Sequence, residues 1–318
     1  MYFIGLILFL SCVGSAVCYY KYSRRGPQYL RSLSQAKEHI DHHIHGSYQE
    51  LSKKPSDSNI VEAIKQGTRS GKRVRSALLL DTVKSCTTET RPMNEALQVA
   101  VAVEYLHGSS LVVDDMPYFD NDTTRRGNPT CWITFGVATS QMAAVSMLGI
   151  ALAKLTMIYS PVLRLVLSIL SSTIGLDGLA GGQAAELNQD PKSKDLSAST
   201  LEDVMNRKTA VFFGAVVAAG WCIGTGITEP TRSMGYVKEA GQSYGRAFQI
   251  RDDIEDIEED TAAGKEHLNY ACIHGIEAAE QRINSELQSC RDILETFSLW
   301  SQIWKDAFDL IRSEDGSV

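Results

Sequence analysis

The chain has little excess charge and few features that would keep it unfolded. Charged residues make up 22% of the 318 residues, and the net charge is −7. Such a mildly acidic chain lacks the basic surface that nucleic-acid binding requires, so we expect no nucleic-acid partner. Only eight prolines are present, which argues against long disordered segments, and 44% hydrophobic residues suffice for a large core.

The seven cysteines form no C-x-x-C pair, which argues against a zinc site or a thioredoxin-like motif. They are also odd in number and widely spaced along the chain. Reduced thiols in a reducing compartment therefore fit the sequence better than a disulfide framework.

The first twenty residues contain no charged side chain. Residues 1–20 are therefore long and apolar enough for a helix that crosses a bilayer. Lys21, Arg24 and Arg25 follow directly, and positive flanks stay on the cytoplasmic side. We expect a single-pass transmembrane signal-anchor, with the rest of the chain on the cytoplasmic side of the membrane. The alternative is a cleaved secretory peptide, although the basic region that precedes such apolar runs is missing.

Strand signals are rare after residue 30, where few stretches alternate with period two. Helical periodicity dominates instead, so the sequence predicts an all-α fold, a single large bundle of ten or more helices. We expect 21–60 to be a connector and first helix region, and 61–318 to be the catalytic domain. The apolar stretches 141–175 and 210–227 are interpreted as helices buried in the bundle rather than further membrane spans.

Two clusters of aspartates end apolar helical segments. Asp114, Asp115 and Asp120 form the first cluster. In the second cluster Asp252 and Asp256 lie four residues apart, on one helical face. Close carboxylates repel one another unless a cation bridges them. Grouped oxygen ligands of this kind suit Mg²⁺, which usually shares its coordination sphere with phosphate groups.

The first cluster is followed by Pro117, which disfavours a helical conformation in the residue before it. We therefore expect the helix to end there and a loop to bring Asp120 back toward Asp114. Arg125 and Arg126 come next, and paired arginines can bind phosphate oxygens bidentately. A single acidic cluster is more often a solvated helix end, but two clusters with adjacent arginines indicate a diphosphate site.

From about residue 30 to 315 the sequence resembles the trans-isoprenyl diphosphate synthase family, and geranylgeranyl diphosphate synthases of bacteria and plastids most of all. Segments 114–130 and 248–256 match the two aspartate-rich motifs of that family. Segment 70–75 resembles its GGKRxR motif, and 182–187 resembles its GQxxDL helix with Glu in place of Asp. The resemblance implies the isoprenoid synthase fold, in which helices surround a central prenyl tunnel, and a homodimer.

The resemblance also implies a role for individual residues. The implied metal ligands are Asp114, Asp115, Asp120, Asp252 and Asp256. The implied catalytic set contains these five residues together with Asp253 and Lys208. The residues implied for isopentenyl diphosphate are Lys72, Arg75, His107 and Arg126. Those implied for the allylic diphosphate are Arg125, Lys208, Thr209, Gln249 and Lys265.

By this likeness the enzyme uses two or three Mg²⁺ ions to hold an allylic diphosphate, which is dimethylallyl, geranyl or farnesyl diphosphate. The double bond of isopentenyl diphosphate then attacks the allylic cation. A terpene cyclase of the same fold is an alternative, but it would need no residues for a second diphosphate. A non-catalytic partner subunit would be expected to have a degraded aspartate motif, and a membrane-anchored scaffold would bind no diphosphate.

Product length is expected to depend on the helix that ends at the first aspartate. By family likeness, the residue five before that aspartate forms the tunnel floor, and an aromatic ring there stops growth at fifteen carbons. Here that residue is Ser109, and Tyr105 lies one helical turn deeper, a rise of about 5.4 Å. One turn is close to one isoprene unit, so geranylgeranyl diphosphate is the expected product. Farnesyl or longer products are the alternative, with the limit set by other helices.

Overall fold

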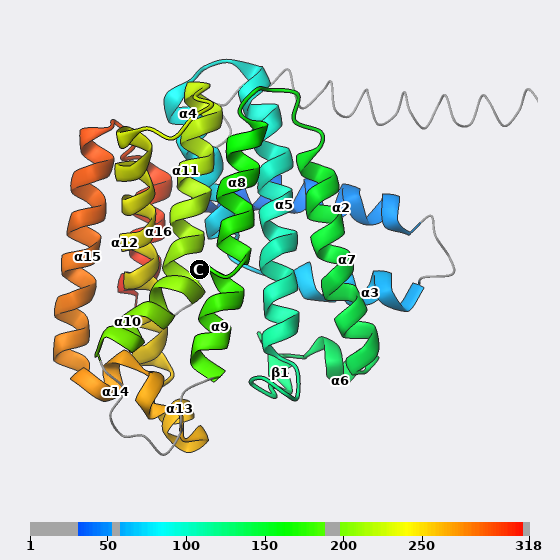
Figure 1. Cartoon of the computed structure of the whole chain (residues 1–318), viewed down its shortest axis with the longest axis vertical. Helices are drawn as coiled ribbons and strands as arrows, with labels where there is room; N and C mark the ends of the chain where they lie inside the picture. Colours follow the sequence, from blue (N-terminus) through cyan, green and yellow to red (C-terminus); the bar gives the residue numbers. More distant parts are fainter. Residues whose placement is uncertain (1–30, 53–57, 188–197, 314–318) are drawn as a thin grey trace, which may run out of the picture.

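The computed structural model of the chain describes residues 31–52, 58–187 and 198–313. The predicted anchor at 1–20 lies outside these residues. Within them the fold is all-α, as predicted, and more than ten helices run along a single bundle (Figure 1).

The helices follow one another along the chain, and one antiparallel hairpin of two short strands interrupts them. The first elements are α2 (Leu33–Leu51), α3 (Ser58–Thr68), α4 (Val74–Cys86), α5 (Thr90–Asp114), β1 (Thr124–Arg125), β2 (Asn128–Pro129), α6 (Cys131–Phe135) and α7 (Val137–Leu155). The later elements are α8 (Leu163–Ile174), α9 (Leu179–Leu187), α10 (Ala198–Met205), a π-helical turn (Asn206–Ala210), α11 (Val211–Thr225), α12 (Arg232–Glu255), α13 (Ile257–Ala263), a 3₁₀ turn (Glu266–Leu268), α14 (Tyr270–His274), α15 (Ile276–Thr296) and α16 (Gln302–Arg312).

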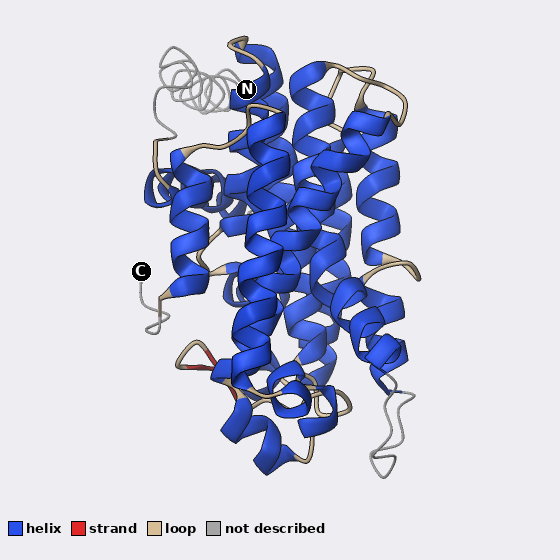
Figure 2. Ribbon diagram, turned by 90° about the vertical axis from the view of Figure 1, so that its left-hand side faces the viewer, coloured by secondary structure: helices blue, strands red, loops and turns tan. Residues whose placement is uncertain are grey.

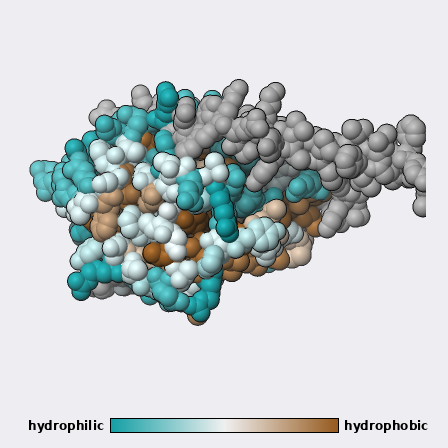
Figure 3. Space-filling view, turned by 90° about the horizontal axis from the view of Figure 1, so that it is seen from above, coloured by the Kyte–Doolittle hydropathy of each residue, from teal (hydrophilic) through white to brown (hydrophobic). Residues whose placement is uncertain are grey.

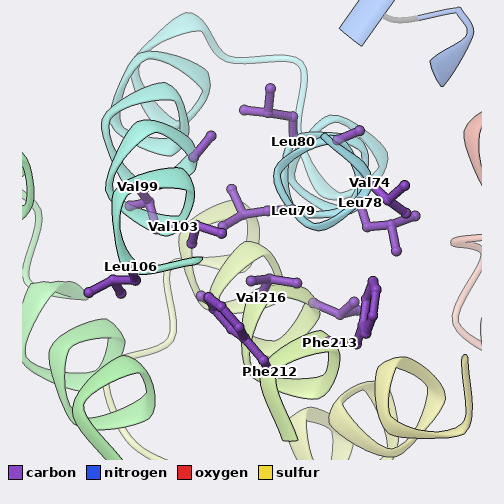
Figure 4. Close-up of a cluster of buried hydrophobic side chains, with 14 of the residues drawn as sticks. Val74, Leu78, Leu79, Leu80, Val99, Val103, Leu106, Phe212, Phe213 and Val216 are labelled. Carbon is purple, nitrogen blue, oxygen red and sulfur yellow. The ribbon is translucent and has the colours of Figure 1, made fainter. Parts of the chain in front are cut away.

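Helix α11 lies at the centre of the bundle because it is apolar on all sides. Residues 212–219 are all buried, and the helix packs against α4, α8 and α12. Figure 4 shows apolar side chains of α4, α5 and α11 in this core, among them Val103 and Val216. The prediction of a buried helix within 210–227 is confirmed.

The prediction that the apolar stretch 141–175 is buried is wrong. Only 28% of the most apolar window of α7 is buried, against 72% for the windows in α5 and α11. Met142, Val145 and Leu152 are 47%, 58% and 56% exposed. The reason is that α7 is apolar around most of its circumference, whereas α3, α5 and α6 cover only one side of it.

Four helical segments of the described chain are long and apolar enough, by length and composition alone, to cross a membrane. They are Thr90–Asp114, Val137–Leu155, Leu163–Leu187 and Thr200–Thr225. The end view in Figure 3 shows apolar side chains reaching a surface that is otherwise largely polar.

Both aspartate clusters lie at the same end of the bundle. The long helices α5 and α12 end there, and the hairpin, α6, α13 and α14 lie around that end (Figures 1 and 2). At the N-terminal side of the described chain, α2 packs against α4, α5 and α16. The functional side chains therefore sit on the ends of long helices whose other faces are fixed by the core.

Candidate active site

Helix α5 ends at Asp114, and the backbone then turns back on itself. The N–H of Asp120 donates to the carbonyl of Asp114 at 3.0 Å, and the N–H of Asn121 donates to the carbonyl of Met116 at 3.0 Å. Asn121 has a φ of 58°, in the left-handed region that asparagine tolerates better than most residues. As predicted, the loop returns Asp120 toward Asp114.

Helix α12 carries the second cluster at its C-terminal end, with Asp252 and Asp256 one turn apart. Gly245 allows α12 to approach the π-helical turn before α11 closely, because a Cβ there would lie 2.7 Å from the Cα of Ala210. A cavity of about 1170 Å³ connects the two clusters. The motif aspartates that line this cavity are Asp114, Asp120, Asp252 and Asp256.

Two other motif aspartates do not line the large cavity. Asp115 accepts a hydrogen bond of 2.6 Å from Nε of Arg125, and it lines a smaller neighbouring cavity of about 280 Å³. Asp253 is 8% exposed and accepts hydrogen bonds of 2.8 Å from Nε2 of Gln249 and from the N–H of Tyr270. The structure thus brings four of the six predicted aspartates to the large cavity.

Burial and the repulsion of neighbouring carboxylates raise the pKa of three carboxyl groups at the cavity, those of Asp114, Asp252 and Asp256. Burial raises the pKa of Asp252 to about 8, and the neighbouring Asp256 and Glu255 add to this effect. Burial also raises the pKa of Asp114 to about 6 and that of Asp256 to about 6. A bound cation would favour the ionised form of each group, because it offsets both causes.

The donor set of the cavity suits a hard divalent cation such as Mg²⁺, since it consists of carboxylate oxygens. Among the described residues, however, no three His, Cys, Asp or Glu side chains are close enough to hold a metal ion by themselves. Mg²⁺ that binds together with a diphosphate typically takes only one or two carboxylate ligands from a protein and the remainder from water and phosphate.

Cationic side chains lie beside these carboxylates. Nζ of Lys265 is 2.9 Å from Oδ1 of Asp120, and Lys208 forms an ion pair with Glu186. Burial lowers the pKa of Lys208, but the adjacent Glu186 and Asp114 more than offset this, so the lysine stays charged. The other predicted allylic-side residues line the cavity, namely Arg125, Thr209 and Gln249.

The π-helical turn before α11 carries Lys208 and Thr209. Single π turns are rare and frequently occur at functional sites. Helix α9 packs closely against this turn, because a Cβ on Gly182 would lie 3.0 Å from the backbone nitrogen of Lys208. The hydroxyl of Thr209 donates to Oε1 of Gln249 at 2.6 Å, which connects the turn to α12.

The four residues predicted for isopentenyl diphosphate, Lys72, Arg75, His107 and Arg126, line the same cavity. The guanidinium of Arg75 lies 4.2 Å from the ring centroid of Phe213, and burial lowers its pKa to about 10. Its buried Nε has no hydrogen-bond partner among the described residues. Burial, followed by the charges of Arg75 and Arg126, lowers the pKa of His107 well below 6.5, so its imidazole is neutral at pH 7.

Sequence reasoning missed the buried ion pairs that hold segment 72–75 in place. Arg73 adopts a φ of 56° before α4, and its side chain is only 4% exposed. It donates to Asp41 and to Glu104, each at 2.8 Å, and Ser76 donates to Glu104 at 2.6 Å. Three cationic residues within four positions do not reveal which of them faces the cavity and which faces the core, so no sequence signal marked Arg73.

Sequence reasoning placed the floor of the prenyl tunnel at Ser109 and Tyr105. In the structure the hydroxyl of Ser109 donates to the carbonyl of Ala144 on α7 at 3.0 Å. The hydroxyl of Tyr105 is hydrogen-bonded to Ser47 on α2. Neither residue lines the large cavity, whereas Ser110, which follows Ser109, does.

An all-helical bundle with two aspartate clusters across one cavity, and two groups of cations beside them, defines an enzyme that acts on diphosphates. Residues 57–269 match the family model for polyprenyl synthetase. The chain therefore belongs to the polyprenyl synthetase family, the trans-isoprenyl diphosphate synthases, and is a prenyltransferase of isoprenoid biosynthesis.

Named relatives agree with this assignment. The chain is 32% identical over 271 residues to a trans-prenyltransferase of African swine fever virus (isolate Tick/Malawi/Lil 20-1/1983), a match that covers 79% of this chain and 75% of the relative. It is 38% identical over 193 residues to the farnesyl diphosphate synthase of Geobacillus stearothermophilus, covering 59% and 62%. The apo structure of an FPP/GFPP synthase from Zymomonas mobilis is similar, with a TM-score of 0.74, 26% identity and coverage of 88% and 97%.

Proposed function

We propose that the chain is a Mg²⁺-dependent synthase that condenses isopentenyl diphosphate head to tail with an allylic diphosphate. One observation carries this proposal. A single cavity is lined by aspartates of both motifs and, in addition, by Lys72, Arg75 and Arg126. One diphosphate would engage the aspartate side through metal, so the second group of cations is best explained by a second diphosphate.

In this reaction the chain holds two substrates and stabilises one leaving group. Mg²⁺ at the aspartates would supply charge that stabilises the departing diphosphate. Arg125, Lys208 and Lys265 add fixed positive charge where negative charge develops, which favours the transition state. Arg75 and Arg126 hold isopentenyl diphosphate so that its double bond faces the allylic carbon. The final proton passes to the released diphosphate, so no side-chain base is required.

Incorporation of radiolabelled isopentenyl diphosphate tests this proposal. The enzyme should incorporate label into an acid-labile allylic product only when an allylic primer and Mg²⁺ are both present. A terpene cyclase would consume the primer without incorporating label, and a non-catalytic subunit or scaffold would do neither. Calorimetric titration with a diphosphate in the presence of Mg²⁺ separates these last two, since a scaffold would give no binding heat.

We further propose geranylgeranyl diphosphate as the main product. In this proposal the small side chain of Ser109 lets the growing prenyl chain pass, and Tyr105 stops it one helical turn deeper. Farnesyl diphosphate is the second candidate, and one observation favours it. The side chain of Ser109 is engaged by α7, and only Ser110 lines the cavity. The limit would then be set nearer to the aspartates, and the product would be one isoprene unit shorter.

The apolar residues 1–20 support the further proposal of a single-pass anchor that leaves the enzyme on the cytoplasmic side. Deletion of residues 1–25 should release an active enzyme from the membrane fraction, because no motif lies before residue 70. If the truncated protein still sediments with membranes, another segment holds it there, and the exposed face of α7 is the first to examine.

We also propose that the enzyme is a homodimer formed through α7. The support for this is the apolar surface that α7 exposes, with Met142, Val145 and Leu152 each about half exposed. Contiguous apolar surface of this kind on a helix is typical of an interface.

A further inference from the structure

Asp253 differs from the other aspartate motif residues in that both of its carboxylate oxygens accept hydrogen bonds from the described residues. Oδ1 accepts from Nε2 of Gln249 at 2.8 Å, and Oδ2 accepts from the N–H of Tyr270 at 2.8 Å. The residue is 8% exposed and does not line the large cavity, although Asp252 and Asp256 on the same helix do. Both oxygens of this carboxylate therefore accept hydrogen bonds from the protein, and the residue lies away from the cavity in which a metal ion would bind.

The segment that Asp253 holds also carries Lys265. The amide of Asn269 donates to the carbonyl of Asp253 at 2.6 Å and to the carboxylate of Asp260 at 2.7 Å. Residues 264–270 are therefore attached to α12 at their C-terminal end by the side chain and the backbone of one residue. Four residues before Asn269, Lys265 extends to Asp120 on the opposite wall, at 2.9 Å.

On its other side Asp253 is connected to the π-helical turn. Gln249 uses its amide nitrogen for Asp253 and its amide oxygen for the hydroxyl of Thr209, at 2.6 Å. Thr209 follows Lys208 directly. A continuous series of hydrogen bonds thus joins the two segments that carry Lys208 and Lys265, and Asp253 is its central member.

We propose that Asp253 is a positioning residue that fixes segment 264–270, and with it Lys265, against the diphosphate of the allylic substrate. This inference rests on the proposed function, since it takes that diphosphate as the group that Lys265 meets. Two adjacent aspartates of one motif then have different roles. Asp252 faces the cavity, whereas Asp253 fixes segment 264–270 beside the cavity.

The variant Asp253→Asn tests this role with little change in shape. Asn has one accepting oxygen and a donating amide nitrogen, so it cannot accept from both Gln249 and Tyr270. We expect amide exchange at Tyr270 to accelerate, and the KM for the allylic diphosphate to rise by about 10–100-fold, as for other residues that orient a site from behind. The Mg²⁺ concentration for half-maximal activity should stay within about twofold of wild type, whereas Asp252→Asn should raise it more.

A double variant distinguishes loss of these hydrogen bonds from general instability of Asp253→Asn. In the combination of Asp253→Asn with Gln249→Glu, the amide nitrogen introduced at position 253 can donate to the carboxylate introduced at position 249. The amide oxygen at position 253 can then accept from the N–H of Tyr270. This pair should restore slow amide exchange at Tyr270, which is measured without substrate or metal. Restoration of slow exchange supports the positioning role even if the wild-type enzyme fails to incorporate isopentenyl diphosphate.

A double-mutant cycle with Lys265→Met completes the test. If Asp253 acts through Lys265, the two substitutions should raise the KM for the allylic substrate together by no more than the larger single effect. Three results would each overturn the proposal. They are KM increases that multiply fully in the double variant, unchanged amide exchange at Tyr270 in Asp253→Asn, and a large shift in the Mg²⁺ dependence of Asp253→Asn.

Discussion

The aspartates at the cavity are held in a state that is unfavourable without a cation. Burial, followed by the charge of the nearby Asp256, raises the pKa of Asp252 to about 8. At neutral pH the folded protein therefore either protonates such a group or tolerates the repulsion. A divalent cation bound between these carboxylates would therefore stabilise the folded protein, because it would offset their repulsion.

We expect Asp252→Asn to lose activity by about 10²–10³-fold, comparable to the loss of one charge-stabilising group in other active sites. The same substitution removes a partly buried carboxyl group that other carboxylates repel, so the melting temperature of the metal-free protein should stay the same or rise. Steady-state kinetics and thermal unfolding without Mg²⁺ measure the two quantities. Near-wild-type turnover, or a large drop in melting temperature, would contradict the role assigned to Asp252.

A carboxyl group far from the site gives the protein a pH-dependent stability. Asp81 on α4 accepts a hydrogen bond of 2.6 Å from Ser301, the N-cap of α16. Its pKa rises from 3.8 to about 6, because burial raises it by more than the hydrogen bond from Ser301 lowers it. Because the folded state binds this proton more tightly than the unfolded state, the associated stability is lost as the pH rises from about 4 to about 6.

The variant Asp81→Asn should not lose stability in this way as the pH rises. The difference in the free energy of unfolding, variant minus wild type, should therefore increase by about 2 kcal/mol between pH 4 and pH 7, from the size of the pKa shift. Urea unfolding at a series of pH values measures this difference, and the exposed Asp292→Asn on α15 is the control. A difference between variant and wild type that does not change with pH would show that Asp81 does not titrate in this range.

Some residues of the site could be predicted from the sequence, namely those for which the spacing along a helix determines the face on which the side chain lies. Asp252 and Asp256 are four apart in a helix, so a common face follows from helical geometry, and the structure has it. The direction of Asp253 could not be predicted, because its partner Tyr270 comes from a turn seventeen positions later. Side-chain hydrogen bonds over such distances depend on the tertiary fold.

At the scale of single elements, α5 connects the metal end of the cavity to the proposed tail path. Its C-terminal end is predictable because Pro117 follows it. The side of α5 on which a tail would lie is less predictable, because Ser109 and Ser110 are equally small and point to different neighbours. Only the packing of α7 against α5 determines that Ser109 faces a carbonyl and Ser110 faces the cavity.

Substitutions on α5 should change the length of the product. Under the geranylgeranyl proposal, Ser109→Tyr shifts the main product to farnesyl diphosphate, and Tyr105→Ala allows chains longer than twenty carbons. Mass spectrometry of dephosphorylated products measures the distribution. Ser110→Tyr is the comparison variant: if it alone shortens the product, the limit lies at the cavity wall near Ser110, and the assignment to Ser109 is wrong.

Helices α7 and α11 show why apolar composition alone did not predict burial. Both are apolar around most of their circumference, yet α11 has neighbours on all sides and α7 on one side only. The sequence contains no local signal for the number of neighbours. For the same reason the all-helical class and the approximate helix positions were predictable, whereas the exposed face of α7 was not.

At the scale of the whole molecule, the exposed face of α7 should mediate self-association. Leu152→Glu should weaken the dimer by about 30-fold or more, which corresponds to about 2 kcal/mol for a central apolar contact. Sedimentation velocity over a range of protein concentrations measures this change. Ile276→Glu, at a position of similar exposure on α15, is the control and should leave the association unchanged. Equal behaviour of the two variants would place the interface elsewhere.

Condensation of two diphosphates in one cavity is tested most directly by mass spectrometry of the products formed from isopentenyl diphosphate and each primer in turn. With dimethylallyl, geranyl or farnesyl diphosphate and Mg²⁺, we expect each primer to gain whole five-carbon units, with geranylgeranyl diphosphate predominant. Omission of isopentenyl diphosphate or chelation of Mg²⁺ should abolish the product. A cyclised product formed from the primer alone, or no five-carbon extension of any primer, would contradict the assignment.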